Sequence, residues 1–518
     1  MTTVPQTAIG SLGRLFALLF AAALLWSCAT PPRTTPLAAA RPAQYLWPGD
    51  LNSDPSTLFI VTASGGGQRA AALALGTLRV LDRIEVSNGT RTMLDEVDMI
   101  SSVSGGSVTA AYFALRGRAG FDDLEQAFIR PSGNGALLGY VLDPSNLAQL
   151  AGPGYSRLDL VIDYMRDSLF GDSTYGDLVG RRPYLIVNAS DMASAATFPF
   201  TQPWFDLLCA ELTEMPLAEA VGASAAVPVL FAPLTVQNSA PCGQQFVPTG
   251  FSADGAQLPA WASWIREGLD FERHGSIERL RRARVALTYL NLDCPTGGPC
   301  TSVPEERQKR WVHLLDGSLT DYLGLTEPLR LISTQEVAPF LLPEIVGGRI
   351  SRIVVIVVSA RVDTALDIDR SGETPDIFDM FRVSITSPIN AGTLGLVARL
   401  LEMVQQGAED YRDELVEFSR VVFKEGDVRG LAVPDGAPDV ERYGLIVDFE
   451  LIDDPDCRRA FNGISTSWTI TPRQTGALLH VAGPLLAANP DFARLVSDMG
   501  GRMPDLDTIA DSCNRLLN

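Results

Sequence analysis

Lysine and histidine are scarce in this chain of 518 residues, which contains two lysines and three histidines. Acidic residues outnumber basic ones by 61 to 41, and the formal net charge is −20. A nucleic-acid-binding surface needs clustered Lys and Arg, so this balance argues against a nucleic-acid partner. So few histidines make a metal cluster improbable. We therefore expect no metal and no cofactor.

The N-terminal apolar stretch, "LFALLFAAALLWSC", is too short for a comfortable membrane span and has the length of a signal peptide. It ends in Leu25–Cys28, which resembles a bacterial lipobox. We expect residues 1–27 to be a lipoprotein-type signal peptide and Cys28 to be lipidated; an ordinary signal peptide cut nearby is the alternative. Ala29 is typical of outer-membrane sorting. Residues 28–50, rich in Pro, Ala and Thr, predict a flexible tether, and the localisation expected is a lipid-anchored protein of the bacterial envelope, at the outer membrane.

CxxC spacing is absent, but six cysteines follow Cys28, an even number that suggests disulfides in an exported protein. Sequence order suggests the pairs Cys209–Cys242, Cys294–Cys300 and Cys457–Cys513. Order alone does not fix the connectivity.

Apolar strand runs alternate with helical patterns from about residue 56 onward. Strands are predicted at 57–63, 97–104, 182–190, 310–318 and 351–360, and helices at 68–84 and 106–117. This pattern predicts an α/β fold with a mainly parallel central sheet and helices on both faces. We expect one catalytic α/β domain at 51–370, with an insertion at about 235–300. A mostly helical extension, 371–518, should pack on the same domain.

Three short stretches are candidates for chemistry, because each follows a predicted strand. They are Gly65-Gly66-Gly67 with Arg69, Ser102-Val103-Ser104-Gly105-Gly106, and Asp316-Gly317-Ser318. The second resembles the G-x-S-x-G nucleophile elbow, with Ser104 at its apex.

The glycine stretch also fits a dinucleotide fingerprint, with Glu85 as the acid further on. However, Glu85 falls at a helix end rather than a strand end. The P-loop alternative fails, because no Lys-Ser/Thr pair follows the glycines. An oxyanion-binding loop is the better interpretation.

Together the three stretches resemble the patatin-like phospholipase family, in its bacterial lipoprotein-type branch. Residues 216–234, "PLAEAVGASAAVPVLFAPL", resemble the family's segment between elbow and catalytic Asp, and 312–325 resemble its Asp stretch. The resemblance covers roughly residues 56–330. It implies a three-layer fold and the hydrolysis of phospholipid or other lipid esters.

By that resemblance Ser104 is the nucleophile and Asp316 the general base, without histidine. We call Gly65, Gly66 and Gly67 the oxyanion loop. Its amides and the amide of Gly105 would hold the oxyanion. Arg69 would organise the loop or add a positive electrostatic field. Ser102, Ser318 and Tyr322 depart from the family pattern, although none removes a reacting group.

Alternatives stay open. A triad would need His480, which lies on an apolar helical pattern and is more typical of a structural residue. His313 lies three residues before Asp316 on a strand and should point to the opposite face.

Residues 374–404 are apolar enough for an interfacial helix or lid, but a buried core helix is favoured. A non-catalytic envelope lipoprotein and an esterase of soluble esters are the other functional classes.

Overall fold

A computed structural model describes residues 34–36, 45, 54–130, 140, 143–150, 154–240, 263–271, 277–295, 300–332, 344–345, 348–361, 372, 374, 377–406 and 439–517. Residues 1–27, Cys28 and most of the predicted tether lie outside this part of the chain.

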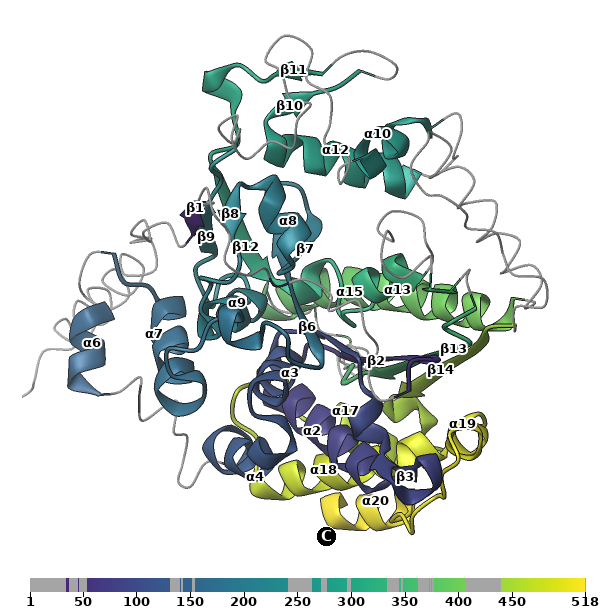
Figure 1. The fold of residues 1–518 in the computed structure, drawn as a ribbon. Coiled ribbons are helices and arrows are strands. Elements are labelled where there is room, and N and C mark those ends of the chain that lie inside the picture. Colours follow the sequence, from purple (N-terminus) through teal and green to yellow (C-terminus); the bar gives the residue numbers. More distant parts are fainter. Residues whose placement is uncertain are drawn as a thin grey trace, which may run out of the picture.

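A mixed central sheet organises the described residues (Figure 1). Seven of its eight strands follow the order β14 (Glu441–Val447), β13 (Arg352–Val358), β2 (Thr57–Ala63), β5 (Met99–Val103), β6 (Tyr184–Asp191), β12 (Trp311–Asp316) and β9 (Leu234–Gln237), and β7 (Ala196–Pro199) pairs with β6. Strands β14 to β6 are parallel, whereas β12, β9 and β7 join antiparallel. The predicted α/β class with a mostly parallel sheet is confirmed.

The central strands are continuous apolar runs because helices cover both of their faces. All seven residues of β2 and six of the seven in β13 are buried. Figure 1 shows the purple helix α2 (Gly67–Arg83) and the yellow helix α18 (Pro472–Ala487) on one side of the sheet, and α13 (Thr326–Ile332) and α15 (Ile377–Gln405) on the other. Helices α3 (Gly105–Arg116) and α9 (Leu217–Ser224) pack on β6.

The C-terminal segment is more than a helical extension, because it supplies the edge strand β14. Helix α18 packs along α2, and α20 (Ile509–Leu517) packs on α18. Two further helices, α17 (Pro455–Asn462) and α19 (Phe492–Asp498), complete this group. The segment therefore shares the core of the sheet that holds the candidate site.

Two helices, α10 (Ser263–Leu269) and α12 (Ile277–Leu290), lie within the described part of the predicted insertion, and Figure 1 shows them in the upper part of the molecule. Residues 234–237, at the expected start of this insertion, form β9 of the central sheet. Helix α15 is not the buried core helix that was favoured. Of its described side chains only Thr393 and Leu400 are buried, and Met380 and Leu394 are more than half exposed.

The disulfides Cys294–Cys300 and Cys457–Cys513 are present as predicted. Cys209 is also disulfide-bonded, and its predicted partner Cys242 lies outside the described residues. Within the described ranges, no helix combines the length and the apolar character needed to cross a bilayer.

Candidate active site

Ser104 occupies the turn between β5 and α3 with a positive φ of 51° and a ψ of −121°. This conformation is costly for a residue that carries a Cβ, and such strain is typical of functional turns. The two following glycines permit the turn. A Cβ on Gly105 would lie 1.9 Å from the carbonyl oxygen of Gly67, and one on Gly106 would lie 2.5 Å from that of Ser64. The sequence therefore builds a strained elbow with Ser104 at its apex.

A second serine holds this elbow in place. The backbone N–H of Ser104 donates to Ser224 Oγ at 2.8 Å, and Ser224 Oγ donates to the carbonyl of Asn188 at 2.6 Å. Ser224 is fully buried at the C-terminal end of α9. No sequence motif marks Ser224 as functional, although it lies within the 216–234 segment that resembles the family.

Asp316 is the last residue of β12, and its carboxylate meets the Ser104 hydroxyl. Ser104 Oγ donates to Asp316 Oδ2 at 2.8 Å, and the amide of Ser318 donates to Asp316 Oδ1 at 2.9 Å. The side chains are only 5% and 4% exposed, respectively. Both carboxylate oxygens are therefore engaged, and one of them faces the serine proton.

The position of Asp316 corrects one expectation about the sheet. The oxyanion loop and Ser104 follow the parallel strands β2 and β5, but β12 runs antiparallel to β6. Asp316 pairs with Ala189, and Val103 pairs with Asn188 of the same strand. We expected Ser104 and Asp316 to meet because both follow the carboxyl ends of parallel strands. Instead, they meet across β6 because β5 and antiparallel β12 pair with neighbouring residues of that strand.

Burial raises the pKa of Asp316 above its usual range. Desolvation is the largest cause, since it disfavours the carboxylate, while hydrogen bonds from Ser318 and Ser104 act in the opposite direction. A carboxyl group with a raised pKa is a stronger base once it is ionised. This is the direction that proton abstraction from a hydroxyl requires.

The oxyanion loop brings the N-terminus of α2 beside the elbow. Gly66 and Gly67 have φ values of 132° and 61°, which only glycine adopts at low cost. The contact between Gly105 and the Gly67 carbonyl joins the beginnings of α2 and α3, where backbone N–H groups carry positive partial charge. This arrangement is suited to stabilising an anion.

Gly65 has a different position from the one expected of an oxyanion donor. Its amide donates to the carbonyl of Tyr322 at 2.9 Å. A Cβ there would lie 2.1 Å from Ser318 Oγ, so glycine is needed for close packing. Gly65 therefore fastens the loop to the segment after Asp316.

Arg69 is completely buried, and it does not provide an open positive charge. Its guanidinium donates to the carbonyls of Asn462 at 3.3 Å, Ile464 at 3.0 Å and Ala360, and it lies over the ring of Phe449. Of the two expected roles, the geometry fits the organisation of the loop. Arg69 ties the start of α2 to β13 and to the C-terminal segment.

The three departures from the family pattern are all accommodated. Ser102 Oγ donates to the carbonyl of Ile186 on the neighbouring strand at 3.2 Å. Ser318 packs on Gly65, and the hydroxyl of Tyr322 donates to the Ala360 carbonyl at 2.7 Å. Ser318 and Tyr322 thus contact the oxyanion loop or its supports.

Neither described histidine contacts Asp316. His313 is exposed and its Nδ1 lies 2.9 Å from Thr235 Oγ1, while His480 lies 3.1 Å from Asp507 Oδ2. His480 is 43% exposed, so it does not belong to an apolar core. Glu85 lies in the short strand β3 (Glu85–Val86), after α2 has ended.

The strained serine, the buried carboxylate and the glycine-rich helix N-termini form a geometry compatible with serine hydrolase chemistry. Residues 61–258 match the family model described as "Patatin-like phospholipase". This part of the chain is therefore similar to patatin-like phospholipases. The matched region contains Ser104 and ends before Asp316.

Among solved structures, the chain is similar to human GIVD cytosolic phospholipase A2, with 12% sequence identity and a TM-score of 0.30. The similarity covers 59% of this chain and 43% of that one, so the chain spans less than half the length of this relative. A comparison with curated proteins finds no match.

Proposed function

We propose that the protein is a lipid acyl hydrolase that uses Ser104 as nucleophile and Asp316 as general base. The observation that carries this proposal is the 2.8 Å hydrogen bond from Ser104 Oγ to Asp316 Oδ2, made at a strained elbow and between two buried side chains. The family match supports a lipid ester as the substrate.

In the proposed reaction Ser104 Oγ attacks the ester carbonyl carbon while its proton passes to Asp316 Oδ2. The negative charge that develops on the carbonyl oxygen faces the amides of Gly66, Gly67 and Gly105; such a donor is worth about 3–4 kcal/mol. Asp316 then gives its proton to the departing alcohol, which leaves an acyl group on Ser104. A water molecule deprotonated by Asp316 releases the fatty acid and restores the serine.

Labelling with a fluorophosphonate tests this proposal, because the reagent reports an activated serine without knowledge of the substrate. The wild-type protein should be labelled and Ser104→Ala should not. Ser512→Ala removes a buried serine in α20 and serves as the matched control, which should label like the wild type. A folded wild-type protein that is neither labelled nor active on any ester would favour a non-catalytic envelope lipoprotein.

We further propose that Cys28 is lipidated and anchors the protein in the bacterial envelope, at the outer membrane. The support is the lipobox-like sequence Leu25–Cys28. Cys28→Ala should release the protein from membranes or block its processing. Unchanged mass and unchanged membrane fractionation would contradict the anchor.

A further inference from the structure

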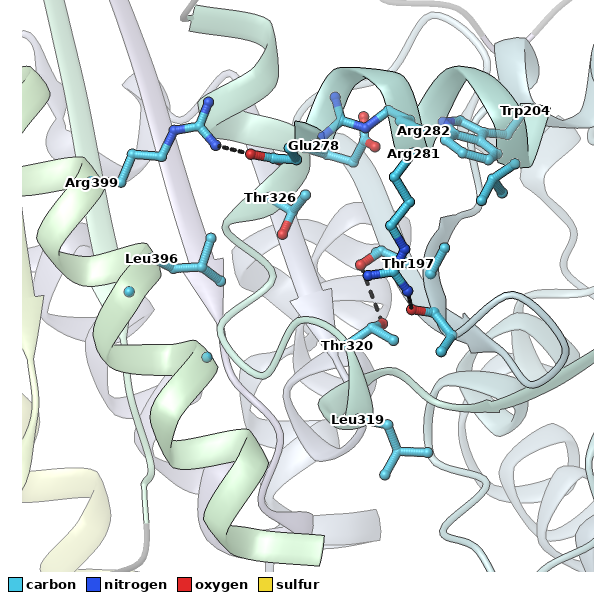
Figure 2. A pocket seen from close by; sticks show the side chains of 16 residues that line it. Thr197, Trp204, Glu278, Arg281, Arg282, Leu319, Thr320, Thr326, Leu396 and Arg399 are labelled. Atoms are coloured by element: carbon cyan, nitrogen blue, oxygen red, sulfur yellow. Dashed lines mark hydrogen bonds and ion pairs between the residues drawn. The ribbon is translucent and has the colours of Figure 1, made fainter. Parts of the chain in front are cut away.

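A pocket of about 540 Å³ lies between α12, α15 and the turn that follows Asp316. Figure 2 shows Arg281 and Arg282 on α12, Arg399 and Leu396 on the facing helix α15, and Thr320 below them. Helices α12 and α15 therefore face each other across this pocket, and Leu319 and Thr320 of the turn after Asp316 form part of its wall.

Hydroxyl groups connect the pocket wall to the backbone of Asp316. Ser190 Oγ donates to the Asp316 carbonyl at 2.8 Å and lies 2.8 Å from Thr320 Oγ1. Thr197 Oγ1 donates to Thr320 Oγ1 at 3.2 Å. Thr197 and Thr320 both line the pocket, and Thr320 is four residues beyond Asp316. A molecule in the pocket would lie next to the segment that carries the proposed base.

The wall of this pocket is basic, although the chain as a whole is acidic. Arg282 and Arg399 both form ion pairs with Glu278, at 3.0 Å and 2.9 Å. Arg281 donates to two neutral carbonyls, Ser194 at 3.2 Å and Ala195 at 2.8 Å. Three arginines thus line the pocket, and Arg281 and Arg399 lie on its two facing helices.

The remaining acidic residue of the lining does not change this balance. Glu327 forms a buried ion pair with Arg330 at 2.5 Å. Guanidinium groups have planar N–H arrays that match phosphate oxygens, and threonine hydroxyls add neutral donors. The combination is typical of a site for a phosphate group.

We infer that this pocket binds the phosphate group of a phospholipid substrate, and that it holds the headgroup beside Ser104 and Asp316. This inference rests on the proposed lipid hydrolase function. Arg399 and Arg281 would contact the phosphate oxygens from the two facing helices. The acyl ester would then reach toward the elbow on the other side of the 317–320 turn.

Binding is measured by calorimetry on the full chain carrying Ser104→Ala, so that no turnover is needed. The probes are dihexanoyl phosphatidylglycerol below its micelle concentration, dihexanoylglycerol, which lacks the phosphate, and inorganic phosphate. Adding Arg399→Gln should weaken phospholipid binding about tenfold or more and leave dihexanoylglycerol unaffected. Arg399→Lys should restore part of the loss.

Arg515→Gln is the matched control, because Arg515 is 49% exposed, also faces one carboxylate, and lies on α20 at the far end of the molecule. It should bind all three probes as the parent does. Equal losses for the two lipids with Arg399→Gln, or no loss, would overturn the inference. Binding of inorganic phosphate without the phospholipid would reassign the pocket to free phosphate and overturn the headgroup assignment. A wild-type protein inert toward all esters would reject the proposed hydrolase without altering these binding results.

Discussion

The hydroxyl of Ser104 donates a hydrogen bond to the carboxylate of Asp316 across strand β6, although the two residues are 212 positions apart in the chain. Ser104 is fixed by the elbow between β5 and α3, and Asp316 by the antiparallel register of β12 on β6. The backbone amide of Ser104 also donates to the hydroxyl of Ser224, and the backbone amide of Ser318 donates to the carboxylate of Asp316. The pair is therefore preorganised by the backbone before any substrate binds.

If the pair acts as a unit, Ser104→Ala and Asp316→Asn should each lower kcat/KM on a short acyl ester by about 10³-fold or more. The double variant should be hardly worse than either single one, because members of a catalytic unit are not additive. His313→Ala and His480→Ala should retain turnover. A His480→Ala protein as inactive as Ser104→Ala would instead indicate a triad.

The raised pKa of Asp316 predicts the acidic limb of the pH profile. The base must be ionised, so activity should fall as the pH drops through a pKa that lies above that of an ordinary aspartate. Ser318→Ala removes a hydrogen bond that lowers this pKa, and it should move the acidic limb of kcat/KM to higher pH. An acidic limb at the usual carboxyl pKa, unmoved by Ser318→Ala, would contradict this.

The same pKa shift predicts a gain in stability when the proposed base is lost. A carboxyl group with a raised native pKa stabilises the fold while it is protonated, and this contribution disappears as the pH rises through the native pKa. At neutral pH the buried carboxylate therefore lowers the stability of the fold, and Asp316→Asn removes this buried charge. The variant should be inactive yet have a higher Tm at pH 7, and the difference should shrink toward pH 4. A lower Tm at pH 7 would show that the carboxylate is needed for the fold.

The sequence predicted most of the parallel core, since continuous apolar runs and following helical patterns are local signals. Strand β2 was predicted with its observed bounds, 57–63, and α2 within one residue at each end. The direction of β12 was not predictable in the same way. The direction depends on pairing with β6 and β9, and the apolar pattern of Trp311–Asp316 does not indicate which strands β12 pairs with.

The candidate site was predictable where its chemistry follows from a motif. Ser104, the glycines and Asp316 follow from turn geometry and from the family resemblance, whereas Ser224 and Ser190 act through tertiary contacts that a single sequence does not reveal. Helix α15 was misjudged for a related reason. Its apolar composition suggested burial, but the helix lies on the surface and its Leu396 lines the pocket.

Arg69 should stabilise the fold and not act by placing a positive charge near the oxyanion. Arg69→Gln would leave buried carbonyls without their donor, at a cost of at least about 3 kcal/mol. Arg459, which is 59% exposed on α17, provides the control, and Arg459→Gln should change the free energy of unfolding by less than about 0.5 kcal/mol. Denaturant unfolding measures both. An Arg69→Gln protein as stable as the wild type would reject the tie between α2 and the C-terminal segment.

Gly105 offers the sharpest test of the oxyanion loop, because the added methyl group of Gly105→Ala meets the Gly67 carbonyl oxygen at 1.9 Å. The backbone must then move, which separates the amides at the beginnings of α2 and α3. We expect kcat/KM to fall by about 10² or more, the loss typical of one missing oxyanion donor, together with about 1–3 kcal/mol of stability. Gly372→Ala, with open space around its Cβ, should be neutral in both measurements. If Gly105→Ala keeps full turnover and full fluorophosphonate reactivity, the close approach of Gly67 and Gly105 has no part in holding the oxyanion.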